Sequence, residues 1–314
     1  MNLTKIRGKI QKILTQPVLA VLLLNLVIPG SGQGLLFRST IISSLVSTPT
    51  PVAPMTIKVM SYNVLFGAGV DRQYDDLLPV ELRNENRLPE FLSIINGVKP
   101  DILGIQEANG WDRGDPPVVQ QVANQLHMNH YLANAPNDFH VVLLTKFEIT
   151  SVENLSGKEG DTIFETMRAL RATLLTPDGQ SLNVFVIHLD PFSTRIRLYQ
   201  VEALLNELEP YKEQTTILMG DMNFCVGWPE YTIVEQAGWQ HVAVATDIDQ
   251  IWISPAVHWA SKPLFLLGNF AMDLRDASDH LPVSSEISIY PNSAGTPIPT
   301  SSALADLYSP GPDC

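Results

Sequence analysis

The segment Ile217-Leu218-Met219-Gly220-Asp221-Met222-Asn223 joins a buried apolar strand to a polar turn. It places the carboxylate of Asp221 and the amide of Asn223 two residues apart, where they can bind a phosphate or a metal-bound water. Asp and Asn are also common in ordinary turns, because their side chains bond to the nearby backbone. The turn is informative because other predicted strands of this chain end in polar side chains as well.

These other polar strand ends differ in their chemistry. They are Asn63, Glu107, His188, Asp249 and the pair Asp279-His280. Each one alone has an ordinary explanation, such as a turn cap, an exposed acid or a histidine satisfied in the core. In α/β folds, however, sites form at strand ends, since the rigid sheet positions the loops. We therefore interpret the repeated pattern as a single functional site.

Strand-like and helix-like patterns alternate along the middle of the chain. Apolar runs predict strands at 57–64, 102–105, 169–175, 182–187, 248–253 and 283–289, besides the one at Ile217. Apolar residues at helical spacing predict helices over 88–98, 118–126 and 198–208. The sequence Pro177-Asp178-Gly179 is a hairpin turn between two of these strands. Hairpins mixed with helical crossovers indicate an α/β fold, with mixed sheets and helices on the outside.

The two ends of the chain differ from its middle. A basic stretch from Lys5 to Lys12 precedes an uncharged apolar run from Pro17 to Ile28, which is typical of a signal peptide and shorter than the roughly 20 residues that span a bilayer. We expect a signal peptide or N-terminal anchor at 1–34, a Pro/Thr-rich linker at 35–54, one domain at 55–290 and a flexible Ser/Pro/Thr-rich tail at 291–314. The protein is therefore expected to be secreted or extracytoplasmic, and to touch a membrane only through an uncleaved N-terminus.

Charge restricts the partners of this domain. The formal net charge is −13, although the first 54 residues are basic, so the remaining chain is more acidic still. A body of this charge has no general affinity for a polyanion, whose binding rests on many Lys and Arg contacts. It can still bind phosphate at one site where a divalent cation offsets the local charge.

The chain has two cysteines, Cys225 and Cys314. Cys225 follows the polar turn and is expected to be a small buried apolar residue. Cys314 ends the tail, so we expect no disulfide between them, and a fold that its core stabilises.

Hydrolysis of a phosphate ester is the chemistry that fits these polar groups. Magnesium prefers carboxylate and amide oxygens, which Glu107 and Asn63 offer. The chain has neither a Cys/His set with zinc spacing nor an HExxH motif, which disfavours a zinc site. A water nucleophile needs a base near neutral pH, and a histidine held by a carboxylate is suited to this.

Taken in order, the polar strand ends resemble a known superfamily. The segments are Met60-Ser61-Tyr62-Asn63-Val64, Ile105-Gln106-Glu107, Ile187-His188-Leu189, Met219-Gly220-Asp221-Met222-Asn223, Ile248-Asp249-Gln250-Ile251 and Ser278-Asp279-His280-Leu281-Pro282-Val283. Their order over about 55–290 resembles the endonuclease/exonuclease/phosphatase superfamily, which includes deoxyribonuclease I, abasic-site endonucleases, neutral sphingomyelinases and inositol-phosphate 5-phosphatases. The resemblance implies two mixed β-sheets packed face to face with helices outside, a four-layer α/β sandwich.

The resemblance also implies a metal-dependent phosphoric ester hydrolase. Glu107 would be the principal ligand of Mg²⁺, with Asn63 beside it and Asp279 near the metal. Mn²⁺ and Ca²⁺ are alternative cofactors. We expect a monomer and infer no protein partner.

The same resemblance implies roles for the remaining side chains. His280, held by Asp249, would be the general base or would orient the phosphate. Asp221 would orient the nucleophile or handle its proton, and Asn223 would bind the transferring phosphate. His188 would be a second active-site histidine, on the leaving-group side or on a phosphate oxygen. Members of the superfamily differ in which group is acid and which is base, so both assignments stay open.

Two departures bear on the substrate. Deoxyribonucleases of this family follow the metal-binding Glu with a basic residue, whereas Ala108-Asn109 follow here. The family's aspartate before the penultimate strand often lies in the sequence Arg-Ile-Asp-Tyr, whereas the segment here is Asp247-Ile248-Asp249-Gln250. We choose Asp249 because it directly precedes Gln250-Ile251. Duplex DNA is therefore disfavoured, while the hydrolytic residues are retained. Arg168 and Arg171 lie on one predicted strand and either reach a phosphate or form surface ion pairs.

The sequence leaves several functions open. The substrate can be a nucleic acid, a phospholipid headgroup or a small phosphate ester. A phospholipid-directed, sphingomyelinase-like enzyme needs an exposed apolar loop, for which Phe139 and the stretch 252–267 are candidates, although such residues are more often core. A secreted binding module with the same fold and no catalysis is an alternative of a second class. A membrane-anchored structural protein is a third.

Overall fold

A computed structural model describes residues 54–78, 80–83, 85–157, 167–244, 248–264 and 277–290. Contacts divide the chain into two units, Met1–Thr50 and Pro51–Cys314, and every described residue belongs to the second. The expected signal or anchor, the linker except its last residue, and the tail lie outside the described residues. Within the described part of the chain, no helix has the length and apolar character needed to cross a membrane.

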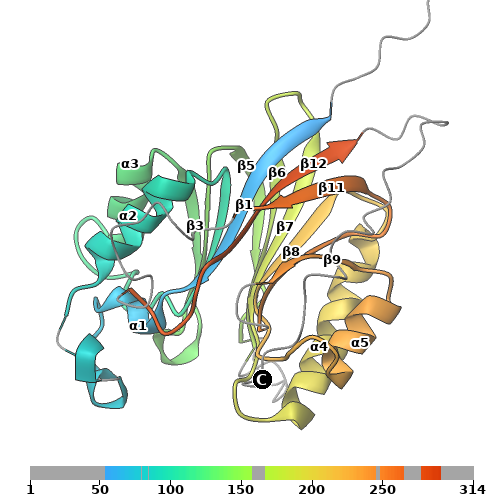
Figure 1. Ribbon diagram of the computed structural model, residues 1–314. Helices are drawn as coiled ribbons and strands as arrows, with labels where there is room; N and C mark the ends of the chain where they lie inside the picture. Colours follow the sequence, from blue (N-terminus) through green and yellow to red (C-terminus); the bar gives the residue numbers. More distant parts are fainter. Residues whose placement is uncertain are drawn as a thin grey trace, which may run out of the picture. The chain divides into compact units, whose positions relative to one another are not determined.

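Two six-stranded sheets form the centre of the second unit (Figure 1). Sheet I has the order β11-β12-β1-β2-β4-β3 and sheet II the order β5-β6-β7-β8-β10-β9. The strands of sheet I are β1 (Met55–Asn63), β2 (Ile102–Gln106), β3 (Asn129–Ala133), β4 (Val141–Thr145), β11 (His258–Pro263) and β12 (Val283–Tyr290). Those of sheet II are β5 (Glu148–Asn154), β6 (Arg168–Leu175), β7 (Ser181–His188), β8 (Thr216–Asp221), β9 (Gln240–Val244) and β10 (Asp249–Ile253).

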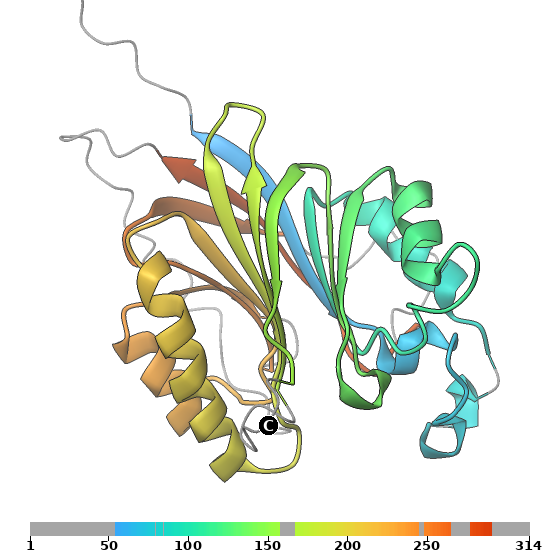
Figure 2. The ribbon, with the colours of Figure 1, turned by 180° about the vertical axis from the view of Figure 1, so that it is seen from behind.

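Helices cover the outer face of each sheet, as the two opposite views show (Figures 1 and 2). The helices α2 (Leu88–Val98) and α3 (Val118–Leu126) pack on sheet I, and α4 (Thr194–Leu208) and α5 (Pro229–Gln236) pack on sheet II. Short helical segments are α1 (Leu65–Ala68), η1 (Asp75–Leu77), η2 (Val80–Leu82), η3 (Pro136–Asp138) and η4 (Glu209–Tyr211). The predicted four-layer α/β sandwich is confirmed.

The main core lies between the two sheets and follows the two-residue period of the strands. On β8 the inward series is Ile217, Met219 and then Asp221; on β1 it is Ile57, Val59, Ser61 and then Asn63. The alternation that buries the apolar residues therefore also points the last, polar residue of each strand into the space between the sheets.

Strand direction brings these ends together. In sheet I, β1 and β2 are parallel with Asn63 beside Gln106; in sheet II, β7 and β8 are parallel with His188 beside Asp221. The strand β10 runs antiparallel to β8, so it begins, at Asp249, opposite Asp221. The strand β12 likewise begins where β1 ends. Strand ends and strand starts from both sheets thus meet at one edge of the sandwich.

Gly220 allows β7 and β8 to approach each other at this edge. A Cβ atom at Gly220 would lie 1.9 Å from the carbonyl oxygen of Ile187. Any side chain there would displace the strand that carries His188. The glycine next to Asp221 is therefore required by packing.

One expectation about the cysteines is wrong. Cys225 is buried, as predicted, but it is disulfide-bonded, and the described residues include no free cysteine. The expectation of no disulfide rested on the position of Cys314 at the end of the expected tail. Cys314, the other cysteine, lies outside the described residues.

Candidate active site

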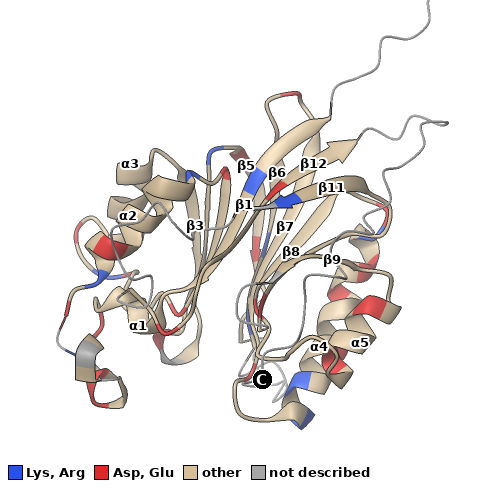
Figure 3. Cartoon of the chain, viewed as in Figure 1, with Lys and Arg blue, Asp and Glu red and all other residues tan. Residues whose placement is uncertain are grey.

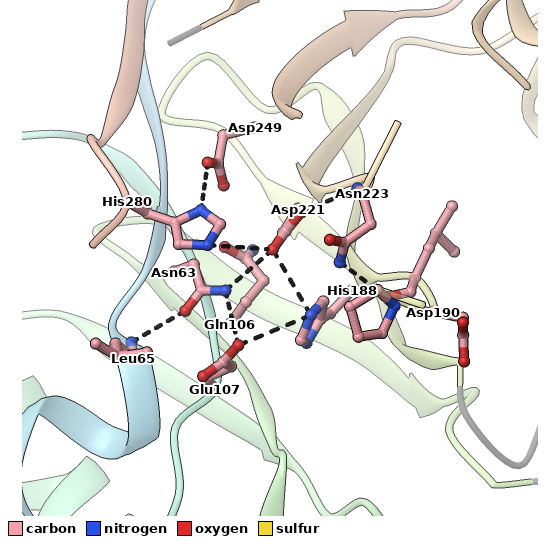
Figure 4. A network of polar contacts seen from close by, with 12 residues as sticks. Asn63, Leu65, Gln106, Glu107, His188, Asp190, Asp221, Asn223, Asp249 and His280 are labelled. Carbon is pink, nitrogen blue, oxygen red and sulfur yellow. Dashed lines mark hydrogen bonds and ion pairs between the residues drawn. The ribbon is translucent and has the colours of Figure 1, made fainter. Parts of the chain in front are cut away.

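Asp221 is the centre of a polar network at the meeting edge of the two sheets (Figure 4). Its side chain is 1% exposed, and its Oδ2 accepts a hydrogen bond of 3.0 Å from Asn63 Nδ2. The Nε2 atoms of His188 and His280 lie 3.6 and 3.8 Å from the same oxygen. Burial raises the pKa of Asp221, Asp249 raises it further, and the two histidines oppose this rise. The site thus holds a buried carboxylate between two imidazoles.

Asp249 holds His280 in place. Its Oδ2 lies 2.7 Å from His280 Nδ1, and Asp249 is fully buried. Burial alone would lower the pKa of His280, but the carboxylates of Asp249, Asp221 and Asp279 together raise it well above the ordinary value. The Nε2 of a charged His280 is then a donor that faces Asp221. The choice of Asp249 agrees with this geometry, whereas Asp247 lies outside the described residues.

Glu107 lies on the other side of Asp221 and comes from sheet I. Its Oε1 accepts from Asn63 Nδ2 at 3.0 Å, and its Oε2 accepts from the backbone N–H of Phe66 at 3.1 Å. His188 Nε2 is 4.0 Å from Oε1. The Glu107 side chain is 13% exposed, so unlike Asp221 it retains contact with solvent.

A left-handed turn, α1, holds the residues around Glu107. Leu65, Phe66, Gly67 and Ala68 have φ values of 44°, 51°, 71° and 55°, and each non-glycine residue in this conformation costs about 1–2 kcal/mol. The turn donates Leu65 N–H to Asn63 Oδ1 at 3.0 Å and Gly67 N–H to the Glu107 carbonyl at 2.7 Å. A Cβ atom at Gly67 would lie 2.1 Å from the Asn109 carbonyl oxygen, so glycine is required there. The protein therefore keeps a strained turn next to Glu107, the predicted metal ligand.

Asp279 and Ser278 close the site from the loop before β12. Asp279 is 48% exposed, and its Oδ1 lies 4.0 Å from His280 Nε2. Ser278 donates its hydroxyl to the Asn63 carbonyl at 2.8 Å and accepts from the His280 N–H at 3.2 Å. Ser278 thus joins the end of β1 to the loop that carries His280.

Asn223 lies beyond Asp221 with a left-handed φ of 51°. Its N–H donates to Asp221 Oδ1 at 2.9 Å, and its Nδ2 donates to the Leu189 carbonyl at 3.0 Å. The structure therefore links all eight predicted residues in one network: Asn63, Glu107, His188, Asp221, Asn223, Asp249, Asp279 and His280. The roles given to them stay predictions.

Two sets of side chains can be compared as metal ligands. Asp221, Asp249 and His280 offer ligand atoms within 4.8 Å of one another. However, Asp249 and His280 Nδ1 already bond to each other at 2.7 Å, and two of the three residues are buried. Glu107 and Asp279 are more exposed and offer the hard oxygen atoms that a hydrated Mg²⁺ prefers. This second set fits a divalent cation better.

The amide of Asn63 is not oriented as that of a metal ligand would be, because its oxygen already accepts a hydrogen bond. Its Oδ1 accepts from Leu65, while its Nδ2 lies between the carboxylates of Glu107 and Asp221. In this arrangement Asn63 is a donor that keeps two negative groups close to each other. Its predicted role as a metal ligand needs the amide oxygen to turn towards the ion.

Arg168 lies next to the network, and the sequence leaves its role open. It continues the inward series of β6 (Leu170, Ala172), and it is buried beside His188 in the strand register. Arg171, three positions away, points outward, pairs with Glu153 at 2.7 Å and stacks on Tyr211. Residues three apart on a strand face opposite sides, and this rule separates the two arginines.

The aromatic candidates for a lipid-contacting loop pack against other side chains. Trp252 and Trp259 are buried in the core. Phe139 packs its ring on Phe66 and Tyr74, at centroid distances of 5.9 and 5.4 Å. Residues 265–267 of the candidate stretch lie outside the described residues.

Comparison with solved structures supports the fold at low sequence identity. ANGEL2, described as a 2′,3′-cyclic phosphatase, is 16% identical with a TM-score of 0.62, covering 76% of this chain and 96% of its own. The human Nocturnin catalytic domain is 20% identical with a TM-score of 0.56, covering 76% and 96%. An endonuclease/exonuclease/phosphatase from Beutenbergia cavernae is 16% identical with a TM-score of 0.56, covering 75% and 72%.

Comparison of the sequence itself gives the family. No curated protein matches the chain in sequence. The model of the Endonuclease/Exonuclease/phosphatase family matches residues 60–280, which include every residue of the network described above. This chain therefore belongs to the Endonuclease/Exonuclease/phosphatase family.

Proposed function

We propose that the protein hydrolyses a phosphate ester by attack of water, with a divalent cation bound at Glu107 and Asp279. The observation that carries the proposal is the buried Asp221 carboxylate, whose Oδ2 lies 3.6 and 3.8 Å from two imidazole Nε2 atoms. A buried acid beside two histidines is suited to proton transfer near neutral pH. Family membership supports phosphate-ester chemistry as the reaction.

The residues divide the reaction between them. Asp221, whose pKa burial raises, accepts the proton of the attacking water as the new oxygen–phosphorus bond forms. His280, kept charged by Asp249, donates through Nε2 to a phosphate oxygen. A cation held by Glu107 and Asp279 would supply positive charge to offset the negative charge that develops on the phosphate and on the leaving oxygen as its bond to phosphorus breaks.

The opposite wall of the site supplies further donors. Asn223 would contact the transferring phosphate after its amide leaves the Leu189 carbonyl. His188 acts on the leaving-group side or on a phosphate oxygen, and Arg168, its neighbour in register, adds positive charge there. Over the described residues, Lys and Arg are scattered among Asp and Glu (Figure 3), and the formal net charge of the chain is −13. We propose a substrate with a single phosphate at the site and no requirement for a long polyanion.

We also propose export. The basic and apolar N-terminal pattern supports it, and the disulfide of Cys225 is typical of proteins from oxidising compartments. Cell fractionation of the full chain, followed by mass determination, would test both export and cleavage. Recovery only from the cytoplasm with the N-terminus intact would contradict this proposal.

The activity is tested with bis(p-nitrophenyl) phosphate in the presence of Mg²⁺, Mn²⁺, Ca²⁺ or EDTA. Glu107→Ala and His280→Ala should abolish metal-stimulated release of nitrophenol, and Arg171→Met, on the outward face of β6, should retain it. A panel of plasmid DNA, RNA, sphingomyelin and inositol phosphates then identifies the substrate class. A folded wild-type protein that releases nothing under any of these conditions would favour the alternative of a catalytically silent binding module.

A further inference from the structure

Arg87 is a buried cation outside the predicted set of site residues. It immediately precedes α2 and is 1% exposed. Its Nη2 donates to the Leu65 carbonyl at 2.6 Å, and its Nη1 donates to the Ala277 carbonyl at 2.8 Å. Both acceptors are main-chain oxygens, although burial of a charged group is costly unless its partners offset the loss of water. The position of Arg87 therefore needs an explanation beyond packing.

The two carbonyls belong to the two segments that build the site. Leu65 lies in the left-handed turn whose N–H groups bind Asn63 and Glu107. Ala277 directly precedes Ser278, Asp279 and His280. One planar guanidinium thus spans two segments more than 200 residues apart in the chain, in a fork geometry that a lysine cannot reproduce.

The left-handed turn depends on contacts of this kind. Arg87 holds it twice, since its own N–H also donates to the Ala68 carbonyl at 2.8 Å. Trp111 holds it once, through a bond of 3.0 Å from Nε1 to the Gly67 carbonyl. A run of left-handed residues persists only where the surrounding structure fixes it. Without these donors the N–H groups that orient Glu107 would be free to move.

Arg87 also interacts electrostatically with the two carboxylates assigned to the cation. Burial lowers the pKa of Arg87, and the Asp279 carboxylate is the charge that most opposes this shift, with Glu107 also contributing. Arginine stays protonated in proteins, so its positive charge attracts both carboxylates.

We propose that Arg87 is a positioning residue that holds the Glu107 side and the Asp279–His280 side of the site in register for metal binding. This inference rests on the proposed function, because Glu107 and Asp279 are the ligands it would orient. Groups that orient the ligands of a metal typically contribute 10–100-fold to metal affinity or activity.

The test compares Arg87→Met with a second buried arginine. Arg197 joins α4 to Glu230 of α5 through a bond of 3.1 Å and touches neither Glu107 nor the loop at Asp279. Both Arg87→Met and Arg197→Met should lower the Tm of the metal-free protein. Calorimetric titration with MnCl₂ should show affinity about tenfold or more weaker for Arg87→Met, and unchanged for Arg197→Met.

Two further variants keep the test decisive. Arg87→Lys keeps the charge but not the fork, and should recover only part of the Mn²⁺ affinity. Trp111→Phe removes a different donor to the same turn, and should weaken Mn²⁺ binding in the same direction; it decides the question if Arg87→Met does not fold. Unchanged Mn²⁺ affinity in the folded Arg87→Met and Trp111→Phe proteins would overturn the inference. A wild-type protein that binds no Mn²⁺ would instead overturn the proposed function and the inference with it.

Discussion

The two sheets contribute different kinds of carboxylate to one site. Sheet I and the loop before β12 supply Glu107 and Asp279, which are 13% and 48% exposed. Sheet II supplies Asp221 and Asp249, which are 1% and 0% exposed. Carboxylates that keep contact with solvent can bind a hydrated cation. Buried carboxylates need partners inside the protein, and here the partners are imidazoles. In the proposed function, this difference separates a metal side from a proton-transfer side.

The largest effect is expected on the proton-transfer side. Asp221→Asn removes the acceptor for the proton of the attacking water and should lower kcat by about 10³-fold. Because the loss is one of proton transfer, higher Mn²⁺ concentrations should not restore the rate. The comparison would be wrong if excess Mn²⁺ returned the variant to wild-type activity. Steady-state assays at increasing MnCl₂ measure this directly.

On the metal side, Glu107→Gln should cause a smaller loss of activity than Asp221→Asn, and added Mn²⁺ should reduce that loss. Glu107→Gln keeps the size of the side chain and its contact with Phe66 but removes the charge, so we expect about a 10²-fold loss at low Mn²⁺. The rate should recover partly as MnCl₂ is raised, in contrast with Asp221→Asn. Equal behaviour of the two variants would remove the distinction between the two sides.

The close approach of β7 and β8 offers a test on stability. Gly220→Ala would place its Cβ atom 1.9 Å from the Ile187 carbonyl oxygen, and the required shift of β7 should cost about 3 kcal/mol of unfolding free energy. Gly179→Ala is the matched control: it also has positive φ but meets nothing within 4 Å, so about 1 kcal/mol is expected. Urea unfolding of both variants gives the difference, and equal losses would contradict the packing explanation.

The charge state of His280 depends on its carboxylate neighbours. Asp249→Asn removes the partner at 2.7 Å, so the pKa of His280 should fall from its raised value. NMR titration of the imidazole in the metal-free protein measures this shift. Because the pKa of His280 is raised in the folded protein, His280 stabilises the fold at pH values below its unfolded-state pKa. This stabilisation is lost as pH rises through its folded-state pKa. An unchanged pKa in Asp249→Asn would show that Asp249 does not set it.

The smallest effect is expected for the pH dependence of stability that comes from His241, whose pKa is set mainly by burial. Burial lowers the pKa of His241 to about 4, between the rings of Tyr231 and Trp252. Because the pKa is lowered in the folded state, the protein is most stable above the unfolded-state pKa of this histidine. That stability is lost as pH falls, and the free energy of unfolding should be about 2 kcal/mol lower at pH 5. In His241→Phe the difference in unfolding free energy between pH 7 and pH 5 should shrink by about that amount. The same pH dependence in both proteins would contradict burial as the cause.

Most interior strands of the two sheets were predictable, whereas the edge strands were not. Strands with apolar residues on both faces, such as β1, β7 and β8, follow from their hydrophobic runs. The four edge strands, β3, β5, β9 and β11, have a neighbour on one side only, and their mixed sequences gave no such signal. The strand β4 and the helix α5 were also missed.

The site was predictable where it continued a strand pattern. Asn63, His188 and Asp221 end inward series of apolar residues, so alternation alone brings them together. Arg168 continues such a series on β6 and could have been separated from Arg171 by the same rule. Arg87 could not have been found, because its partners are carbonyl groups whose positions depend on the left-handed turn and on a loop distant in sequence.

Metal binding to three proteins tests the division of the site most directly. Calorimetric titration with MnCl₂ of the wild type, Glu107→Gln and Asp221→Asn separates affinity from catalysis. We predict that Glu107→Gln binds Mn²⁺ at least tenfold more weakly than the wild type, and that Asp221→Asn binds it with nearly the same affinity while remaining inactive. Loss of Mn²⁺ binding in Asp221→Asn with retention in Glu107→Gln would contradict the assignment and place the cation among the buried carboxylates of sheet II.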